Sequence, residues 1–205
     1  MAKLNIAPTK SSLLSLKKQL LFAEEGYDLL EQKRQILIFE LMSRLNRARD
    51  AETRIAGAFK GAFAALREAT LDIGSSALDC AALGVSLDHQ VTLGDQHLMG
   101  MKIPRVTLRA EPPSAQFGVS GTSANADLAM CRFIEALPLL AELAELENAV
   151  LRLARELRKT QRRCNALSKI FIPDYRETIG YIAGALEERE RESFIILKMI
   201  RDRLA

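Results

Sequence analysis

The sequence predicts an all-α fold, a long antiparallel two-helix coiled coil with a small β-hairpin in the connector. Three observations support this fold class. Apolar residues recur every three to four positions through two long regions, which is the period of an amphipathic helix. The composition favours long helices over a compact interior, because aromatic residues make up only 5% of the chain and Trp is absent. The segment between the two regions alternates apolar and polar residues, as strands do.

The first predicted helix covers residues 10–74. Its apolar positions are spaced alternately by three and four residues, which is typical of a left-handed coiled coil. Thr9, after Pro8, is expected to cap this helix. At 1.5 Å per residue the helix would be roughly 95 Å long and would need a partner to bury its stripe. Only Arg34 and Arg44 interrupt the stripe, whose other members are Leu13, Leu16, Leu20, Ala23, Tyr27, Leu30, Leu37, Leu41, Ala48, Ala51, Ile55, Ala58, Ala62, Ala65 and Ala69.

The second predicted helix covers residues 123–203, with Ser123 as its expected cap. Kinks are expected at Pro138 and Pro173. Two matching helices joined by one connector should fold back antiparallel, so the chain is predicted to form a single elongated domain, residues 1–205. The stripe runs through Leu139, Leu143, Leu146, Val150, Leu153, Leu157, Thr160, Cys164, Leu167 and Phe171, and it resumes one residue out of step through Ile172, Tyr175, Ile179, Ile182 and Leu186.

Between the helices, residues 85–104 are predicted to form the β-hairpin and residues 105–122 a loop. Gly94 and Asp95 are expected to make the turn, and Pro104 to end the second strand or lie at an edge. A bend between helices usually needs only about 2–8 residues, so this longer connector suggests a further task. The alternating apolar residues that indicate the first strand are Val85, Leu87, Val91 and Leu93.

Three residues near the middle of the connector allow two interpretations. Met99 and Met101 could pack within the hairpin or make soft contacts with a partner. Gly100 between them favours a bulge or a close approach of the backbone.

The composition disfavours several classes of function. The 29 basic and 26 acidic residues leave a net charge of only +3, which does not suggest a nucleic-acid binder. Cys80, Cys131 and Cys164 are too far apart to suggest a disulfide framework or a metal site. His89 and His97 are expected to be exposed strand residues and not ligands, and neither a metal nor a cofactor is expected.

No targeting or membrane segment is expected. Residues 1–5 lack the apolar region of a signal peptide. No apolar run approaches the roughly 20 residues that span a bilayer. The chain is therefore expected to be cytoplasmic, without direct membrane insertion.

Four ordered blocks resemble the D subunit of V-type and archaeal-type ATPases. Together they cover nearly the whole chain, and Cys164, where the family commonly has Val, is a change that the core tolerates. The blocks are Ala7–Lys10 with Asp28–Arg34, then Met99–Pro104, then Gly121–Ala124, and lastly Thr160–Leu167 with Ile172-Pro173, Thr178-Ile179, Tyr181-Ile182 and Leu186–Arg191.

The resemblance implies a non-catalytic rotor shaft of the central stalk, peripheral to the membrane. Both termini would enter the cavity of a hexamer of A and B subunits. The middle of the chain would face the membrane rotor through a rotor-ring adaptor protein and would bind the small F subunit of the central stalk. The chain has no Gly-x-x-x-x-Gly-Lys-Ser/Thr loop, which agrees with nucleotide chemistry in other subunits.

The resemblance also suggests contact residues for each partner. Those expected to face the hexamer are Thr9, Lys10, Leu13, Arg189, Phe194 and Lys198. Those expected to contact the rotor through the hairpin are His97, Met99, Gly100, Met101, Lys102 and Pro104. Those expected to contact the F subunit are Arg44, Ala48 and Ala51.

Several alternatives stay open at this point. Arg34 and Arg44 could pack their aliphatic stems with their heads in solvent, or they could meet acidic groups of the F subunit or fix the helix register. The alanines could form a thin coil or a surface for a partner helix. Lys10 lies where the helix dipole disfavours a cation, which suggests a contact with the hexamer. A coiled-coil scaffold or chaperone-like clamp, or a helical enzyme, would be the competing function.

Overall fold

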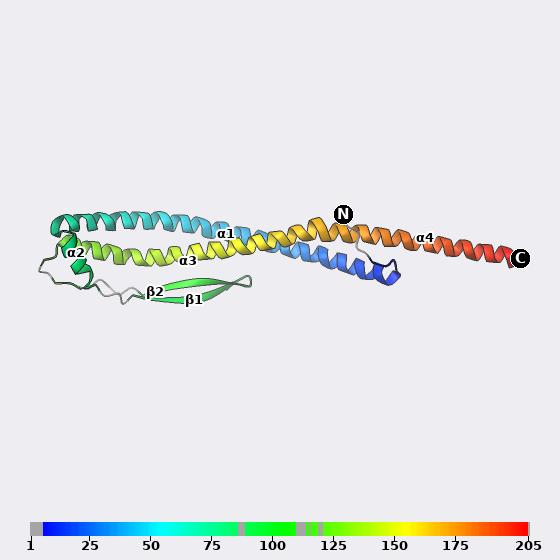
Figure 1. The fold of residues 1–205 in the computed structure, drawn as a ribbon, viewed down its shortest axis with the longest axis horizontal. Coiled ribbons are helices and arrows are strands. Elements are labelled where there is room, and N and C mark those ends of the chain that lie inside the picture. The colour runs from blue at the N-terminus through cyan, green and yellow to red at the C-terminus, as the bar shows by residue number, and fades with distance from the viewer. Residues whose placement is uncertain (1–5, 86–88, 110–113, 115, 119–120, 205) are drawn as a thin grey trace. The chain divides into compact units, whose positions relative to one another are not determined.

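The computed structural model describes residues 6–85, 89–109, 114, 116–118 and 121–204. It confirms the fold class, because long helices pair and a two-stranded antiparallel hairpin lies in the connector (Figure 1). The chain divides into two compact units, a first unit of residues 1–38 and 156–205 and a second unit of residues 39–155. The elements in order are α1 (Lys10–Ile73), α2 (Ser75–Ala82), β1 (Gln90–Leu98), β2 (Met101–Arg109), α3 (Ala124–Ala166), the π-helix η1 (Leu167–Phe171) and α4 (Ile172–Leu204).

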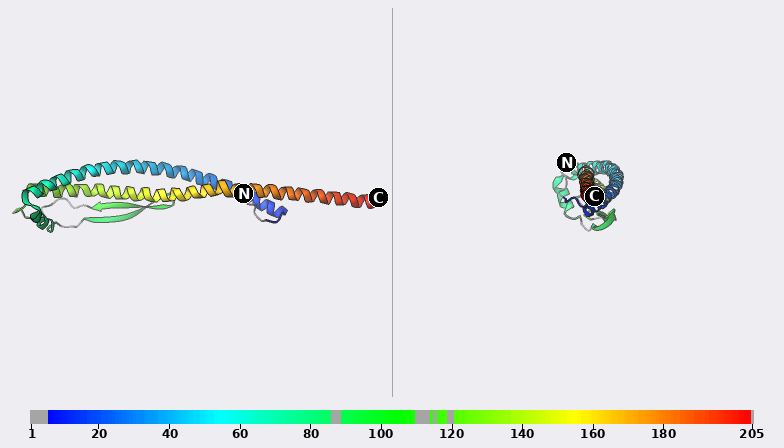
Figure 2. Two further views of the ribbon diagram at one scale, coloured as in Figure 1. Left: turned by 45° about the horizontal axis from the view of Figure 1, so that its top comes forward. Right: turned by 90° about the vertical axis from the view of Figure 1, so that its right-hand side faces the viewer.

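In the first unit, the start of α1 packs on the end of α3 and on α4 (Figure 2). Leu16 and Leu37 are at most 2% exposed, and so is Cys164 on the facing helix. Farther along, Ile182 of α4 is completely buried. The heptad stripe is therefore the core of this unit, and each of its predicted positions is buried or half-buried except Phe171, which is 47% exposed.

The π-helix explains why the stripe slips by one residue. A π-helical turn takes up one residue more than an α-helical turn. Phe171, the last residue of η1, is rotated out of the core, and Ile172 takes the next buried position at 9% exposure. The interruption expected at Pro173 thus lies one turn before it, while Pro138 remains inside an unbroken α3.

The second unit has a core of small side chains. Ala51, Ala62 and Ala69 of α1 are at most 1% exposed, and Ala136 and Ala149 of α3 are equally buried. Small residues let the two backbones come close, which favours the thin-coil interpretation of the alanines. Larger side chains fill the same core at Ile55, Leu146 and Leu153.

The hairpin turn differs from the prediction. It is made by Met99 and Gly100, both with positive φ (49° and 79°), and not by Gly94 and Asp95. Two positive φ angles are what a type I′ turn requires. A two-residue turn at 94–95 would have placed Pro104 at a hydrogen-bonded ladder position, where its missing N–H would cost a bond. In the observed register Pro104 pairs with Asp95 at a position that needs no ladder donor.

The strand boundaries also differ from the prediction. β2 continues to Arg109, into the predicted loop, and β1 begins only at Gln90. Part of the predicted first strand lies outside the described residues, at 86–88. A short helix that was not predicted, α2, follows Gly74.

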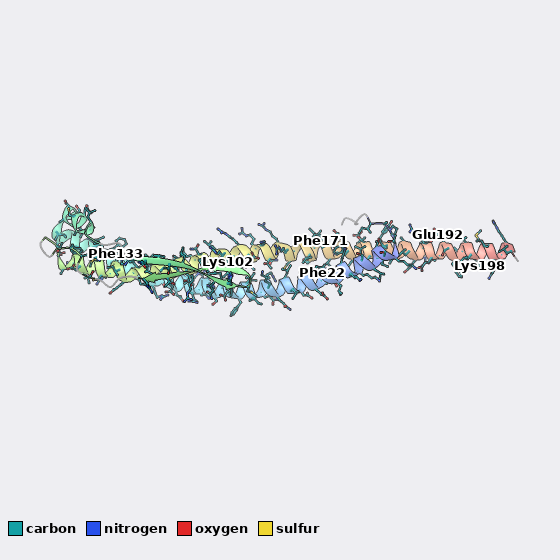
Figure 3. The ribbon with its side chains drawn as sticks, turned by 90° about the horizontal axis from the view of Figure 1, so that it is seen from below. Phe22, Lys102, Phe133, Phe171, Glu192 and Lys198 are labelled. Atoms are coloured by element: carbon teal, nitrogen blue, oxygen red, sulfur yellow. The ribbon has the colours of Figure 1, made fainter. Side chains whose placement is uncertain are left out.

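The hairpin packs along α3 through the outer edge of β2 (Figure 3). Ile103 is buried, at 1% exposure. The backbone N–H of Val106 donates to Glu145 Oε2 at 2.9 Å, and Arg152 Nη1 donates to the carbonyl of Lys102 at 2.6 Å. Glu145 and Arg152 are seven residues apart and therefore lie on one face of α3. Two side chains thus satisfy strand-edge groups that would otherwise face water.

The two predicted caps behave differently. Thr9 Oγ1 accepts a hydrogen bond from the backbone N–H of Ser12 at 3.1 Å, so this cap is confirmed. Ser123 occupies the cap position of α3, where its carbonyl accepts from the N–H of Ala126 at 2.9 Å. Its hydroxyl is buried and, within the described residues, has no hydrogen-bond partner.

We expect the Glu145→Ala variant to loosen the hairpin without unfolding the helices. The Val106 amide would lose a charged acceptor, a bond of about 1.5–3 kcal/mol, so its hydrogen exchange should accelerate roughly tenfold or more. Exchange monitored by NMR measures this change. Glu147→Ala, an exposed residue of the same helix, is the control, and equal exchange rates in the two variants would contradict the docking role of Glu145.

Candidate interaction surfaces

The start of α1 is tied to α4 within the first unit. Lys10 Nζ lies 2.8 Å from Glu190 Oε1, and Arg189 Nη1 donates to the carbonyl of Pro8 at 3.0 Å. The hydrogen bond between Lys10 and Glu190, more than their Coulomb attraction, raises the pKa of Lys10 and lowers that of Glu190. Lys10 therefore has a partner in its own chain that offsets its unfavourable place in the first turn. Thr9 is exposed beside it, and Leu13 is half-buried in the stripe.

Beyond these contacts with the start of α1, the rest of α4 is not covered by other described parts of the chain. Every described residue from Glu187 to Leu204 is exposed. Phe194 is 71% exposed, and Lys198 lies on the same free end (Figure 3). The other large apolar side chains exposed here are Ile195, Ile196, Leu197, Met199, Ile200 and Leu204.

A polar layer interrupts the core of the first unit at Arg34. Its Nη1 donates to Gln161 Oε1 at 2.9 Å, and its Nη2 contacts Glu31. The bond to Glu31 raises the pKa of Arg34. Beside this layer, burial raises the pKa of the Cys164 thiol, which keeps that thiol protonated and unreactive at neutral pH.

A groove in the first unit was missed by the sequence reasoning. It encloses about 850 Å³ beside Phe22 and Leu29 of α1 and Phe171 and Tyr175 (Figure 3). Phe22, Leu29 and Ile36 are spaced by seven residues and are exposed. This second heptad series, beside the main stripe, was the available signal.

The residues expected to contact the F subunit lie in the second unit. Arg44 Nε donates to Glu40 on its own helix at 2.6 Å. Ala48 and Ala51 are 9% and 1% exposed and pack against Leu146. Ala48 also borders a groove of about 350 Å³ between α1 and α3.

The residues expected to contact the rotor lie on the hairpin. His97, opposite Lys102 in the ladder, is exposed, as are Met99 and Gly100 at the turn. Met101 and Pro104 are half-buried. The turn is therefore accessible, whereas Ile103 is buried and the outer edge of β2 contacts α3. β1 also exposes Val91 and Leu93 at 59% and 75%.

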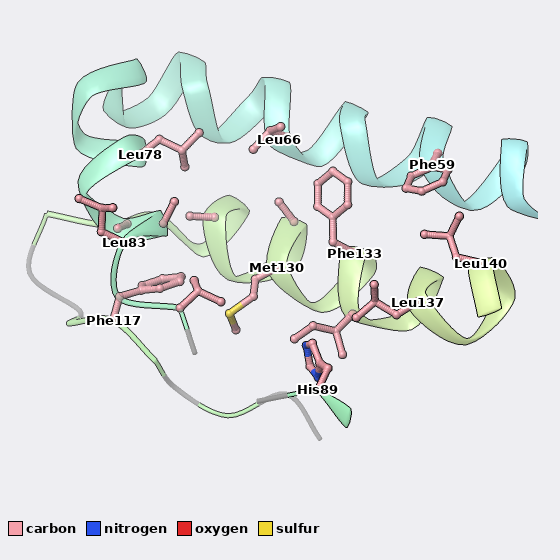
Figure 4. A pocket seen from close by; sticks show the side chains of 16 residues that line it. Phe59, Leu66, Leu78, Leu83, His89, Phe117, Met130, Phe133, Leu137 and Leu140 are labelled. Atoms are coloured by element: carbon pink, nitrogen blue, oxygen red, sulfur yellow. The ribbon is translucent and has the colours of Figure 1, made fainter. Parts of the chain in front are cut away.

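His89 is not the exposed strand residue that the sequence predicted. It precedes β1, is half-buried, and lines an apolar cavity of about 590 Å³ in the second unit (Figure 4). Phe59 and Phe133 line this cavity. Phe63 packs against both to form an aromatic cluster, and its ring meets that of Phe133 edge to face at 5.3 Å. The cavity is covered partly by α2 and Phe117, which the sequence pattern did not place there.

Neither a metal centre nor a membrane span is found in the described part of the chain. No group of three His, Cys, Asp or Glu side chains there could hold a metal ion. None of the described helices is long and apolar enough to cross a bilayer.

Comparison with known proteins identifies the family. A family model described as that of the D subunit of ATP synthase matches residues 12–202. The chain belongs to this ATP synthase D-subunit family. The match includes all of α3 and η1 and nearly all of α1 and α4, so the family extends over both units.

Curated relatives in this family match the chain over almost its entire length. The V-type ATP synthase D subunit of Thermotoga neapolitana is 35% identical over 98% of this chain and 100% of its own. The A-type ATP synthase D subunit of Methanosphaera stadtmanae is 37% identical over 96% of this chain and 93% of its own. A V-type ATP synthase D subunit of Treponema pallidum, designated D 2, is 40% identical over 98% and 96%.

The Lys10–Glu190 pair should depend on pH in a defined way. Because the pKa of Lys10 is raised in the folded chain, its charge contributes to the free energy of unfolding at lower pH, and this contribution is lost as pH rises through the raised pKa. Because the pKa of Glu190 is lowered, its charge contributes to the free energy of unfolding at higher pH, and this contribution is lost as pH falls through the lowered pKa. The pair should therefore be intact between about pH 5 and pH 10.

Chemical shifts of the two side chains followed by NMR titration would measure this window. The contribution should be small and screened by salt, because both side chains are largely exposed. In a Glu190→Gln variant the pKa of Lys10 should fall toward its ordinary value. An unchanged Lys10 titration in that variant would show that the pair does not form.

Proposed function

We propose that this chain is the central-stalk rotor shaft of a V-type rotary ATPase or ATP synthase. It would couple ATP hydrolysis or synthesis in a hexamer of A and B subunits to ion translocation by a membrane ring. Membership of the D-subunit family supports this function. The structural observation that supports it best is the uncovered apolar end of α4.

The exposed residues at this end point in all directions around the helix. Consecutive residues of an α-helix are rotated by about 100°, so Phe194, Ile195, Ile196 and Leu197 cover the whole circumference. One partner helix could cover only one side of such a segment. A sleeve that surrounds the helix could cover every side, and large exposed apolar surfaces mark interaction sites. The cavity of a hexamer is such a sleeve.

The shaft would carry out no reaction itself. Two antiparallel helices of different sequence have no threefold symmetry, so three equivalent pairs of A and B subunits would face different surfaces of the shaft at any moment. Each orientation would favour a different state of each pair, which is coupling between distant sites. Nucleotide binding and hydrolysis would belong to the hexamer.

The second unit would connect the shaft to the other rotor parts. Val91 and Leu93 on β1 contribute little to the hairpin's own packing, since both are well exposed. The exposed turn at Met99 and Gly100 would contact a rotor-ring adaptor protein. Arg44 and the groove beside Ala48 would contact the small F subunit. The chain would therefore be peripheral to the membrane, held there through the complex.

Replacing the apolar end of α4 tests the shaft function. We expect Phe194→Ser combined with Leu197→Ser to leave the helicity and Tm of the isolated chain unchanged, because these side chains are 71% and 64% exposed. Affinity for the A and B hexamer should fall at least tenfold, since burying one such side chain contributes about 1.5–3 kcal/mol. Co-purification and titration binding measure the loss.

Glu192→Ser, at an exposed polar position of the same helix, is the matched control. The control should assemble normally and support ATP-driven rotation. Full affinity and rotation in the double variant would refute the placement of this end inside the hexamer.

A second test addresses the hairpin. We expect Val91→Ser combined with Leu93→Ser to keep the thermal stability of the isolated chain but to change the ATPase rate or weaken attachment to the membrane rotor. Gln96→Ser on the same strand is the control. If rate and attachment stay normal while the isolated chain loses stability, the hairpin serves only as a structural cap.

A further inference from the structure

The polar layer at Arg34 is built differently from the rest of the stripe. Arg34 occupies a core position between Leu30 and Leu37 and is only half-buried, while Leu37 is fully buried. Its guanidinium bonds across the interface to Gln161 at 2.9 Å. Gln161 in turn donates to Asn165 at 3.0 Å, so the acceptor is itself held in place.

The layer is sensitive to the loss of its partners. The Nε of Arg34 is buried and, within the described residues, already lacks a hydrogen-bond partner. Thr160 and Cys164, both 2% exposed, supply the facing core positions. Moving Gln161 away would leave more of the guanidinium unpaired beside these buried side chains, which is costly.

A repetitive apolar stripe does not by itself fix how far two helices slide along each other. Away from η1, where the stripe slips by one residue, a shift of one heptad, about 10 Å, replaces a core residue by another residue of the same series. The observed register also makes ion pairs in this unit. Arg176–Glu24 and Lys10–Glu190 are the more exposed ones, whereas Lys33–Glu156, at 3.8 Å, is half-buried and adds to the polar layer at Arg34. Exposed pairs contribute little to stability.

We propose that Arg34 and Gln161 form a register lock that fixes the axial alignment of the helices in the first unit. A shift in one direction brings Ser168 to the place of Gln161 and sets Arg163 against Lys33, where Glu156 now lies at 3.8 Å. A shift in the other direction is no better, because the residue seven positions before Gln161 is Ala154, which has no acceptor. Both shifted registers are therefore disfavoured, because Arg34 loses its acceptor Gln161 and, in the first of them, two cations face each other.

The second cation of the stripe does not have this role. Within the described residues, Arg44 bonds only to Glu40 on its own helix, so a slide of the helices would leave that pair intact. Arg44 is therefore a matched control. Register is a property of the isolated chain, so its test does not depend on the proposed function.

Cross-linking of the isolated full chain reads the register directly. Cys80 and Cys131 are replaced by Ser in all variants, and the buried Cys164 is kept. Glu24→Cys is combined with Arg176→Cys to report the observed register. The same Glu24→Cys combined with Ser168→Cys, which allows for the extra residue of η1, or with Ala183→Cys reports a shift by one heptad in either direction. A short bis-maleimide joins the thiols.

With Arg34 present, only the 24/176 pair should cross-link above background. In Arg34→Leu, which replaces the layer by an apolar contact, a shifted pair should reach at least a tenth of the 24/176 yield, with no loss of Tm. Arg34→Lys, which keeps a cation, should restore the single register. Arg44→Leu should behave like the parent chain.

A folded Arg34→Leu chain whose shifted pairs stay at background would overturn the proposal. So would equal slipping in Arg44→Leu, because slipping would then not be specific to this layer. If Arg34→Leu does not fold, the double replacement Arg34→Leu with Gln161→Leu leaves no unpaired polar group from this pair and is scored by the same cross-links. A single observed register in that folded variant would again rule out the lock.

Discussion

Burial of one apolar stripe between antiparallel helices is the constraint on which the other features depend. A helix as long as α1, with 64 residues, cannot cover its own stripe and is stable only against a partner. In the first unit, leucines and isoleucines provide much of the buried area. In the second unit, alanines bring the backbones close and bury less, so α2, the aromatic cluster and the hairpin add contacts to the same helices.

Departures from the stripe are satisfied locally. The π-helix η1 takes up one residue and returns Ile172 to the core after Phe171 leaves it. Arg34 is accommodated by Gln161 and Glu31 instead of being driven out of the interface. The free edge of β2 is covered by Glu145 and Arg152. Each irregularity is therefore accommodated close to where it arises, while α1 and α3 remain unbroken α-helices.

The surfaces left uncovered by this packing are the ones that the proposed rotor function uses. The end of α4 and the apolar residues of β1 contribute little to the fold of the isolated chain. A protein that acts by differential contact needs such surfaces more than it needs a reactive pocket. The Phe22 groove and the cavity beside His89 are further apolar surfaces, and nothing in the described residues indicates a reaction at either.

The sequence by itself determined the two long helices, their stripes and the cap at Thr9, because a heptad repeat and a capping hydroxyl are local patterns. It also carried the family resemblance through its ordered blocks. Only tertiary structure decided the turn at Met99 and Gly100, the burial of His89, and the partners of Lys10 and Arg34. The turn depends on how the strands pair, because Pro104 must lie at a position that needs no ladder donor. Lys10 and Arg34 contact Glu190 and Gln161 only after the helices have paired. The spacing of residues along the sequence does not by itself show which of these contacts form.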